Sequence, residues 1–384
     1  MRILAEKMAD AEGVRERVLL SVQDGKIAGI DSWNNATRPE AFDVDARDAL
    51  VLPGFLDIHV HGGAGRAVME GTEDALNAVA LHLARHGVTG FLSTTITAAW
   101  DDQLAALRMA ANAMRSPENG RNGAAVLGCH LEGPYINPKR KGAQPGQYIL
   151  LPDVEDFKSR VGDLISVVKV ITLAPEMPGA LDLIRFLTSQ GTIVSIGHTD
   201  ASYDEIDAAI EAGARHITHC FNAMSQLGSR EPGVVGAALS RPELTAELIW
   251  DNVHVHAASC RALINAKGPN GVILISDGIP GAGMEEGYAF SLGDLPVVVH
   301  SGTARLPDGT LAGSVLTLET AFANAHPYDL MERAAMSSRN ASVALGLGGS
   351  KGLLAPGFDA DYVLLNPDGS VRQTFVAGNC VYSS

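Results

Sequence analysis

Histidines and carboxylates stand at the ends of several apolar segments in this 384-residue chain. The residues concerned are His59, His61, Glu132, His198, His219, His254 and Asp277. Imidazole and carboxylate groups are ligands of zinc first, with iron, manganese and cobalt as alternatives. A bound metal lowers the pKa of a coordinated water, and an acid–base group then carries the proton to a leaving group. The pattern predicts a divalent-metal hydrolytic site, with Asp277, alone at the last segment, as the acid–base residue.

The spacing of the histidines narrows the choice of ligands. Side chains on a strand alternate with period two, so His59 and His61 share a face and both point into one site. His216 and His219 are three apart and lie on opposite faces. His219, nearer the C-terminal end of its segment, is therefore the predicted ligand of that pair.

Each of these residues has an ordinary structural explanation when it is taken alone. Glu132 could cap a turn, His198 could be a turn residue, and the HxH pair could be two loop histidines. His82 and His86, four apart in an amphipathic stretch typical of a surface helix, are not expected to bind metal. Structural or surface positions are predicted for His216, His256, His300 and His326. Because such groups recur at six segment ends, one metal site is favoured over separate explanations.

The segments that carry these groups alternate with helical patterns. Eight strands are predicted, at residues 55–61, 88–95, 125–132, 167–174, 192–198, 216–221, 247–254 and 272–277. Near-continuous apolar strands separated by helices predict a parallel sheet, and eight of them predict a (β/α)8 TIM barrel. Active sites of such barrels lie at the C-terminal ends of the strands. A doubly wound open sheet is the alternative, disfavoured because no GxGxxG follows the first strand.

The two ends of the chain have a different pattern. Short strand-like runs flank Asp24-Gly25 near the N-terminus and Asp368-Gly369 near the C-terminus, which are hairpin signals. We therefore predict a small β-sandwich domain from residues 1–51 and 356–384, and a metal-dependent barrel domain from 52–355. An insertion rich in Gly and Asp follows the eighth strand, at residues 279–318.

Composition restricts the class of function. Hydrophobic residues make up 46% of the chain, enough for a large core, and the net charge of −15 argues against non-specific nucleic-acid binding. The basic stretch at 139–141 is expected to be a solvated loop rather than a phosphate clamp. The four cysteines lie far apart without CxxC spacing, which is typical of reduced thiols. With no signal-peptide pattern and no apolar run long enough to span a membrane, we expect a cytoplasmic protein.

Several motifs, taken together, resemble a known family. They are PGFLDIHVHG, HLEGPYIN, GHTDASYDE, THCFNAMSQLGSREPG, DNVHVH, SDG and LAGS, in this order. The sequence is similar in these motifs to the N-acetylglucosamine-6-phosphate deacetylase family of the amidohydrolase superfamily. The resemblance implies a (β/α)8 barrel with a small β-sandwich, usually as a homodimer.

The resemblance also implies roles for individual residues. It places a metal on Glu132, His198 and His219, a second metal on His59 and His61, and acid–base catalysis on Asp277. Substrate contacts are implied for Ala143, Asn222, Ala223, Arg230, His254, Leu311, Ala312 and Gly313. Arg230 would help to bind the sugar phosphate, commonly across the dimer interface.

One position departs from the family pattern. Where the family usually has KGAH, this chain has KGAQ, so Gln144 stands in place of a histidine that contacts the substrate. An amide donates a hydrogen bond but carries no charge. The predicted reaction is hydrolysis of the acetamide of N-acetyl-D-glucosamine 6-phosphate. The alternatives are another N-acetyl-hexosamine such as the galacto epimer, or an amidohydrolase that acts on an N-acyl amino acid or a cyclic amide.

Overall fold

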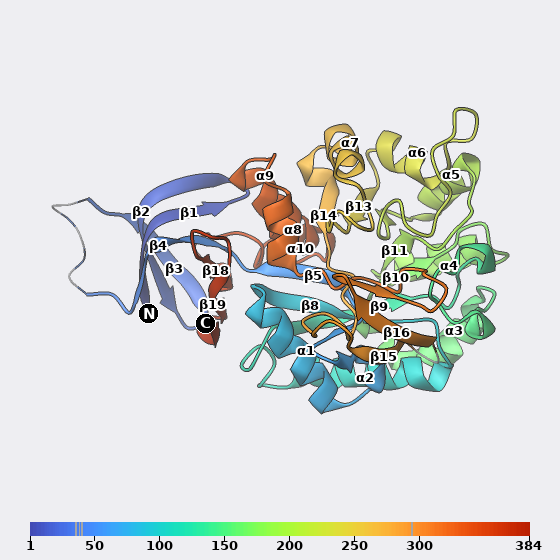
Figure 1. The fold of residues 1–384 in the computed structure, drawn as a ribbon, viewed down its shortest axis with the longest axis horizontal. Helices are drawn as coiled ribbons and strands as arrows, with labels where there is room; N and C mark the ends of the chain where they lie inside the picture. Colours follow the sequence, from blue (N-terminus) through green and yellow to red (C-terminus); the bar gives the residue numbers. More distant parts are fainter. Residues whose placement is uncertain (35–36, 38, 40, 293–294) are drawn as a thin grey trace.

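The computed structural model describes residues 1–34, 37, 39, 41–292 and 295–384. Its centre is an eight-stranded sheet in the order β14-β13-β12-β11-β10-β9-β8-β5, in which neighbouring strands run parallel (Figure 1). The strands are β5 (Phe55–Val60), β8 (Val88–Thr95), β9 (Ala125–Glu132), β10 (Val168–Leu173), β11 (Ile193–Ile196), β12 (His216–Ile217), β13 (Thr245–Leu248) and β14 (Val272–Leu274). The predicted (β/α)8 fold class is confirmed.

The first and last strands of this sheet meet and nearly close it into a barrel. A parallel bridge joins Val60 to Gly278, and the amide of Asp277 donates to the carbonyl of His59 at 2.9 Å. The amide of His61 likewise donates to the carbonyl of Gly278 at 2.7 Å. Because of this closure, the HxH pair and Asp277, more than 200 residues apart in the chain, become neighbours.

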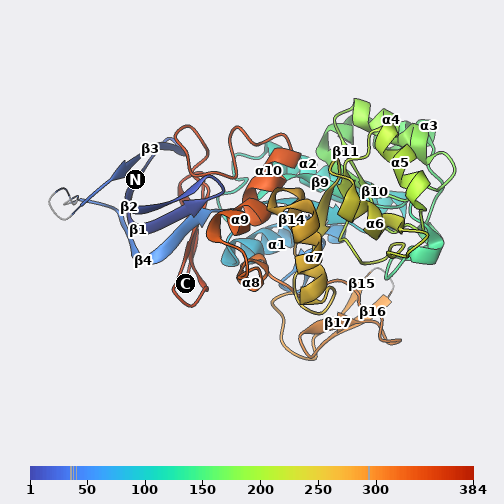
Figure 2. The same cartoon turned by 90° about the horizontal axis from the view of Figure 1, so that it is seen from above.

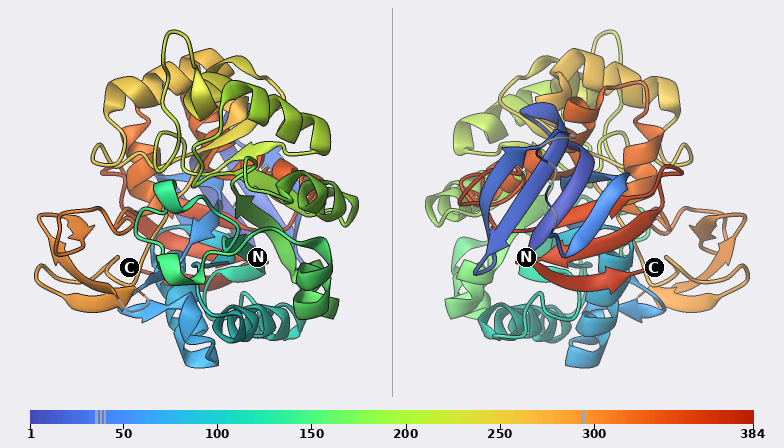
Figure 3. Two further views of the ribbon diagram at one scale, coloured as in Figure 1. Left: turned by 90° about the vertical axis from the view of Figure 1, so that its right-hand side faces the viewer. Right: turned by 90° about the vertical axis from the view of Figure 1, so that its left-hand side faces the viewer.

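Helices cover the outside of the barrel (Figure 3). They are α1 (Glu73–Arg85), α2 (Trp100–Arg115), α3 (Val154–Val161), α4 (Ala180–Ser189), α5 (Tyr203–Ala212), α6 (Gly233–Ser240), α7 (Ala257–Lys267), α8 (Leu318–Asn324), α9 (Leu330–Ala334) and α10 (Asn340–Ala344). The Thr72 side chain caps α1, and Ser202 with Glu205 forms a capping box at α5. Short helical turns are η1 (Val68–Glu70), η2 (Pro138–Arg140), η3 (Gly146–Tyr148), η4 (Gly162–Val167), η5 (Pro269–Gly271) and the π-turn η6 (Ala335–Arg339).

The strands and helices share one large apolar core. Side chains such as Phe55, Phe91 and Trp250 are almost fully buried in it. Burial of one side chain of this size contributes roughly 1.5–3 kcal/mol. The core therefore gives the strand ends a rigid base, which a site with several ligands requires.

The insertion after β14 forms a small sheet of its own. Strands β15 (Ala289–Leu292), β16 (Leu295–His300) and β17 (Thr303–Arg305) are antiparallel and project from one side of the barrel (Figure 2). A bridge between Arg305 and Leu311 leads the chain back over the strand ends. A short hairpin, β6 (Gly62–Gly63) with β7 (Arg66–Ala67), follows β5 at the same end.

Both chain ends build a second sheet at the far end of the molecule (Figure 1). Its order is β20-β19-β18-β4-β1-β2-β3, with strands β1 (Arg2–Asp10), β2 (Gly13–Gln23), β3 (Lys26–Ser32), β4 (Val44–Pro53), β18 (Tyr362–Leu365), β19 (Val371–Val376) and β20 (Asn379–Ser383). Asp24 and Gly25 both have positive φ at the predicted hairpin, as a tight turn requires. The predicted β module of the two termini is confirmed. The exact domain limits remain a proposal.

The last four strands of the barrel are shorter than predicted, and β11 and β14 end at Ile196 and Leu274 rather than at residues 198 and 277. β12 covers only His216–Ile217, and β13 ends at Leu248 rather than at residue 254. The φ angles of His219 (26°) and Asn252 (64°) lie outside the extended region, so the chain has already turned there. His219 and His254 therefore lie in loops at the mouth of the barrel. In the part of the chain that the structure describes, no helix has the length and apolar character to cross a bilayer.

Candidate metal centre

Three predicted ligands meet at the end of β9, and we call them the first cluster. Oε1 of Glu132 lies 3.2 Å from Nε2 of His198 and 3.1 Å from Nε2 of His219. The two Nε2 atoms are 3.1 Å apart, and all three side chains are buried. Residues from three different strand ends thus aim one ligand atom each at a single point.

Another three predicted residues, His59, His61 and Asp277, form the second cluster. Nε2 of His59 lies 3.3 Å from Nε2 of His61, and Oδ1 of Asp277 lies 3.5 Å from the former and 3.3 Å from the latter. Glu132 joins the two clusters, because its Oε1 lies 3.3 Å from His59 Nε2 and its Oε2 lies 3.4 Å from His61 Nε2. The site is therefore one continuous group of donors with a shared carboxylate.

The hydrogen bonds behind the imidazoles show that the donor atoms fit a cation. Nδ1 of His198 lies 2.9 Å from the Arg140 carbonyl, and Nδ1 of His61 lies 3.2 Å from the Thr94 carbonyl. A carbonyl accepts only, so each Nδ1 carries a proton, and in the neutral ring each Nε2 presents a lone pair. Lone pairs of nitrogen then face the carboxylate oxygens of Glu132 at hydrogen-bond distance. Without a metal, protonation of the rings satisfies this arrangement; with the rings neutral, a cation between nitrogen and carboxylate does so, as in a metal site.

The pKa shifts of the buried groups also indicate a site that suits a cation. Burial raises the pKa of Glu132, but His198 and His59 outweigh it and hold that pKa well below its usual range. Burial raises the pKa of Asp277 as well, and His59 and His61 reverse this to a lowered pKa. Burial lowers the pKa of His59, but Glu247, Glu132 and Asp277 raise it well above its ordinary value. Glu132 and Asp277 are thus ionised, and a positive charge beside them stabilises them.

Three of the clustered residues have an uncommon backbone conformation. His198, His219 and Asp277 have φ values of 47°, 26° and 48°, in the left-handed region that side chains other than glycine avoid. Residues held in such conformations concentrate at functional sites, where the surrounding structure stabilises them. Gly133, next to Glu132, has φ 79°, and a Cβ there would lie 2.1 Å from Thr97 Oγ1. The glycine of the HLEGP motif therefore fits a turn with no room for a side chain.

A cavity of about 500 Å³ opens above the clusters. Eight of the nine predicted substrate contacts line it, namely Ala143, Gln144, Asn222, Ala223, His254, Leu311, Ala312 and Gly313. Arg230 does not line it and is exposed on the surface of this protomer. Three cations that the sequence analysis did not place at the substrate do border it: Lys139, Arg140 and Arg305.

Gln144 contacts the ligands directly. Its amide nitrogen donates to Oε2 of Glu132, and its amide oxygen accepts the backbone N–H of Thr97 at 2.7 Å. The Thr97 N–H fixes which end of the amide faces Glu132, because a backbone nitrogen only donates. Gln144 therefore orients the shared carboxylate, a contact that the sequence did not reveal.

Glu247 is the main residue of the site that sequence reasoning missed. It is completely buried on β13 and contacts His59, His216 and the backbone of His219. The one signal for it was an acid inside the apolar run AELIW.

His216 was expected to be structural or on the surface, and the structure buries it against Glu247. The prediction that His82 lies on a helix surface is wrong. Only 6% of His82 is exposed, because residues of the insertion cover it near Gly283. Burial, with the charges of His86 and Arg85, lowers its pKa to about 3.

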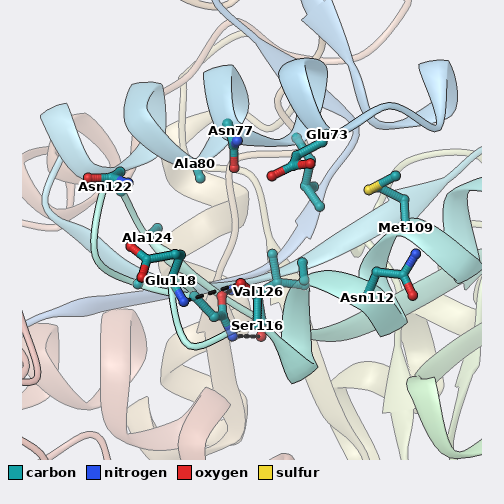
Figure 4. Close-up of a pocket in the computed structure, with 15 residues that line it drawn as sticks. Glu73, Asn77, Ala80, Met109, Asn112, Ser116, Glu118, Asn122, Ala124 and Val126 are labelled. Atoms are coloured by element: carbon teal, nitrogen blue, oxygen red, sulfur yellow. Dashed lines mark hydrogen bonds between the residues drawn. The ribbon is translucent and has the colours of Figure 1, made fainter.

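A separate cavity lies away from the strand ends, between α1 and α2 (Figure 4). Its labelled side chains include Glu73, Asn77, Asn112 and Glu118. Within the described ranges, the groups of histidine and acid that could hold a metal all lie in the barrel instead. The chemistry therefore concentrates at the strand-end cavity.

A parallel barrel with histidines and carboxylates converging at its C-terminal strand ends defines a metal-dependent hydrolase. The chain belongs to the amidohydrolase family, whose model matches residues 50–381. The resemblance predicted from the sequence motifs is thereby confirmed.

Individual relatives cover nearly the whole chain. N-acetylglucosamine-6-phosphate deacetylase of Bacillus subtilis (strain 168) is 38% identical over 95% of this chain and 93% of its own length. N-acetylgalactosamine-6-phosphate deacetylase of Escherichia coli O157:H7 is 36% identical over 97% of each protein. A mutant N-acetyl-D-glucosamine-6-phosphate deacetylase from Mycobacterium smegmatis, solved in complex with N-acetyl-D-glucosamine-6-phosphate, has a TM-score of 0.92 and 31% identity. That match covers 100% of this chain and 99% of the other.

Proposed function

We propose that this chain hydrolyses the acetamide of N-acetyl-D-glucosamine 6-phosphate, giving D-glucosamine 6-phosphate and acetate. The observation that carries the proposal is the shared Glu132 between two histidine clusters, with Asp277 at the base of a cavity of about 500 Å³. The relatives named for this reaction align with almost all of the chain.

Glu132, His198 and His219 would hold the metal, and His59 with His61 would hold a second one. Zinc suits this set of imidazole nitrogens and carboxylate oxygens, with iron, manganese and cobalt as alternatives. A metal in this position would polarise the acetamide carbonyl and lower the pKa of the attacking water.

Asp277 would carry the protons of the reaction. Its pKa is lowered, so it is an ionised base at neutral pH. It would accept the proton of the attacking water and deliver that proton to the nitrogen of the leaving amine. The carbon–nitrogen bond of the acetamide breaks, and the water oxygen stays with the acetate.

His254 and Gln144 are the candidates for stabilising the oxyanion. His254 Nδ1 lies 2.6 Å from Asp251 Oδ2, which orients the ring toward the cavity that it lines. One N–H of Gln144 is already donated to Glu132, so only the other remains for the substrate. His254 is therefore the stronger candidate.

The phosphate group requires cations, and two arrangements compete. Arg230 is exposed, and Leu227, three residues earlier, is 58% exposed. Exposed apolar and cationic residues three positions apart in the chain suit a homodimer in which Arg230 reaches the partner's cavity. In the second arrangement, Lys139 and Arg305 bind the phosphate within one protomer, because both border the cavity.

The test is acetate release from N-acetylated hexosamines of gluco and galacto configuration, with and without 6-phosphate, by protein of known metal content. We expect activity that depends strongly on the 6-phosphate and is lost in Asp277→Asn. Equal rates with free and phosphorylated sugars would contradict the phosphate assignment. A rise in KM in Arg230→Ala but not in Arg305→Ala supports the dimer arrangement, and the reverse supports the single protomer.

The galacto epimer is the second candidate substrate. One relative that is 36% identical over 97% of the chain carries the name N-acetylgalactosamine-6-phosphate deacetylase. The gluco and galacto sugars differ in the orientation of one hydroxyl group. Their relative rates of acetate release therefore show which of them is the preferred substrate. The cytoplasmic location expected from the sequence also stays a prediction. The four cysteines are free thiols, which is compatible with that location.

A further inference from the structure

Glu247 lies behind both clusters and outside the lining of the cavity. Its Oε2 lies 2.9 Å from Nδ1 of His59 and accepts the backbone N–H of His219 at 3.0 Å. Its Oε1 lies 3.2 Å from Nε2 of His216. One carboxylate therefore contacts a side chain of the second cluster and the backbone of the first.

We propose that Glu247 is a positioning residue that couples the two clusters, because it sets the tautomer of His59 and holds the backbone of His219. This inference rests on the proposed metal site. An ionised carboxylate accepts only, so His59 carries its proton on Nδ1 and directs the Nε2 lone pair toward Glu132. A carboxylate behind a metal-binding imidazole also strengthens that imidazole as a ligand.

His59 differs in this respect from the other histidines of the site. His61 and His198 donate to neutral backbone carbonyls. Nδ1 of His219 is buried and has no hydrogen-bond partner among the described residues. Within the two clusters, the described contacts thus give a carboxylate partner behind the ring to His59 alone. We expect His59 to be the strongest imidazole ligand of the second cluster.

The contact with His219 acts through the backbone. His219 has φ 26°, and its N–H is buried at the turn after β12. A buried N–H that loses its acceptor favours another conformation of the turn. Glu247 therefore also fixes the direction in which the His219 ring enters the first cluster.

A rival explanation is that Glu247 is itself a ligand, in a deeper metal site with His59 and His130. The contacts of His130 argue against this. Its Nδ1 lies 3.1 Å from the Ile58 carbonyl, and its Nε2 lies 2.7 Å from Thr172 Oγ1. Both ring nitrogens are engaged, so neither is left to bind a metal.

The first experiment compares zinc binding by the chelator-stripped full chain and by its Glu247→Gln variant, in competition with a chromophoric chelator. The glutamine oxygen can still accept from His59 while its NH₂ faces His216, so the shape is kept and the charge is lost. We expect zinc at the second cluster to bind roughly 10- to 100-fold more weakly. Asp57→Asn is the control, because that buried carboxylate accepts the His59 backbone N–H at 3.2 Å and does not touch its ring. It should bind zinc as the wild type does.

The outcomes separate the inference from the proposed function. Equal zinc affinity in wild type and Glu247→Gln overturns the part of the inference that rests on the charge of Glu247 and leaves the proposed function intact. The tautomer of His59, which the glutamine oxygen would preserve, is tested by nuclear magnetic resonance of the wild-type protein. Wild-type protein that binds no zinc overturns both the inference and the proposed function. Loss of one zinc per chain, with wild-type affinity at the two clusters, would make Glu247 a ligand and contradict the positioning role.

A second measurement is made on the wild-type protein, and a variant serves only to assign one signal. Nuclear magnetic resonance of metal-free wild-type protein with labelled histidine reports the tautomer of each ring, and His59→Gln identifies the His59 signal. If His59 is neutral, we expect its proton on Nδ1. If the ring is protonated on both nitrogens, we expect Nδ1 to keep its proton longer than Nε2. A neutral His59 with its proton on Nε2 would overturn the inference.

Discussion

The two clusters share Glu132 but are built in different ways. The first cluster takes its residues from β9 and from the turns after β11 and β12, where His198 and His219 have positive φ. The second cluster exists because β5 and β14 meet, with His59 and Asp277 joined by a backbone hydrogen bond of 2.9 Å. The first cluster therefore depends on local turns, and the second on closure of the barrel.

The clusters also differ in the groups that they contain. The first holds two imidazoles and the shared carboxylate, which suits tight retention of a metal. The second contains Asp277, the acid at the base of the cavity, and a histidine supported by Glu247. Under the proposed mechanism, the first cluster would mainly hold the metal and the second would mainly transfer protons.

The largest expected effect is that of Asp277→Asn. An amide cannot accept the proton of water, so kcat should fall by about 10²- to 10⁴-fold. Zinc retained by the first cluster should remain, because Asp277 is not part of it. Acetate release and metal analysis on the same sample check both expectations.

Asp200→Asn serves as the matched control, because Asp200 pairs with Arg140 at 2.7 Å and is only partly buried. It should keep most of the activity. If Asp277→Asn kept wild-type activity, the assignment of proton transfer to the second cluster would be wrong.

Variants that each lack one proposed ligand, from the first or the second cluster, compare the zinc affinities of the two clusters. His198→Asn should weaken zinc binding by more than the roughly 10- to 100-fold that follows loss of a residue behind a ligand. His61→Asn should leave one zinc per chain in place. The measurement is zinc per chain after dialysis against a weak chelator.

His130→Asn is the control for a change of a buried histidine. Both nitrogens of His130 contact protein oxygens, so its loss should lower stability without changing zinc per chain. Equal zinc loss in His198→Asn and His61→Asn would show that the first cluster does not bind zinc more tightly than the second.

Much of this arrangement follows from the sequence, for a physical reason. Period-two alternation places His59 and His61 on one face, and a parallel barrel brings strand ends together. Sequence reasoning could therefore predict that these side chains and Asp277 lie together without any contact being known, while their roles stay predictions. It failed for the ends of the last four strands, because non-glycine residues such as His198, His219 and Asp277 adopt positive φ only where tertiary contacts hold them.

Contacts behind the ligands could not be predicted from local patterns. Glu247 reaches His59 across 188 positions of sequence, and Gln144 meets the Thr97 N–H across 47. Neither separation in sequence corresponds to the period of a strand or a helix, so no local pattern predicts these contacts. His82 was misplaced for a similar reason, because the insertion that covers its helix begins almost 200 residues later.

The stability of the metal-free protein should fall as pH rises above neutrality. The pKa values of His59 and His198 are raised by neighbouring carboxylates despite burial. Their contribution is fully present below the unfolded value, about 6.5, and is lost as pH rises through the folded values. Both clusters should therefore lose part of their stabilising contribution as the pH rises.

Thermal unfolding of chelator-treated protein between about pH 6 and pH 9 measures this loss of stability. His198→Gln and His59→Gln should each make this loss smaller. Zinc-loaded protein should show the opposite trend, because metal binding favours deprotonated ligands. A metal-free melting temperature that rises over this range would contradict the assigned charges.

The smallest expected effect concerns Gln144, which contacts Glu132 on the side of the second cluster. Gln144→Ala leaves the Thr97 N–H and Oε2 of Glu132 without their partner, which should cost about 1–3 kcal/mol of unfolding free energy in metal-free protein. Gln144→His can satisfy both groups, one ring nitrogen accepting and the other donating, so it should recover that stability. Urea unfolding of both variants is the measurement, and Gln190→Ala, at an exposed glutamine, is the control. If Gln144→His recovered stability and also raised kcat, the amide would limit the rate through the orientation of the shared carboxylate. If Gln144→Ala unfolded like the wild type, Gln144 would not hold Glu132, and its role would be limited to the substrate.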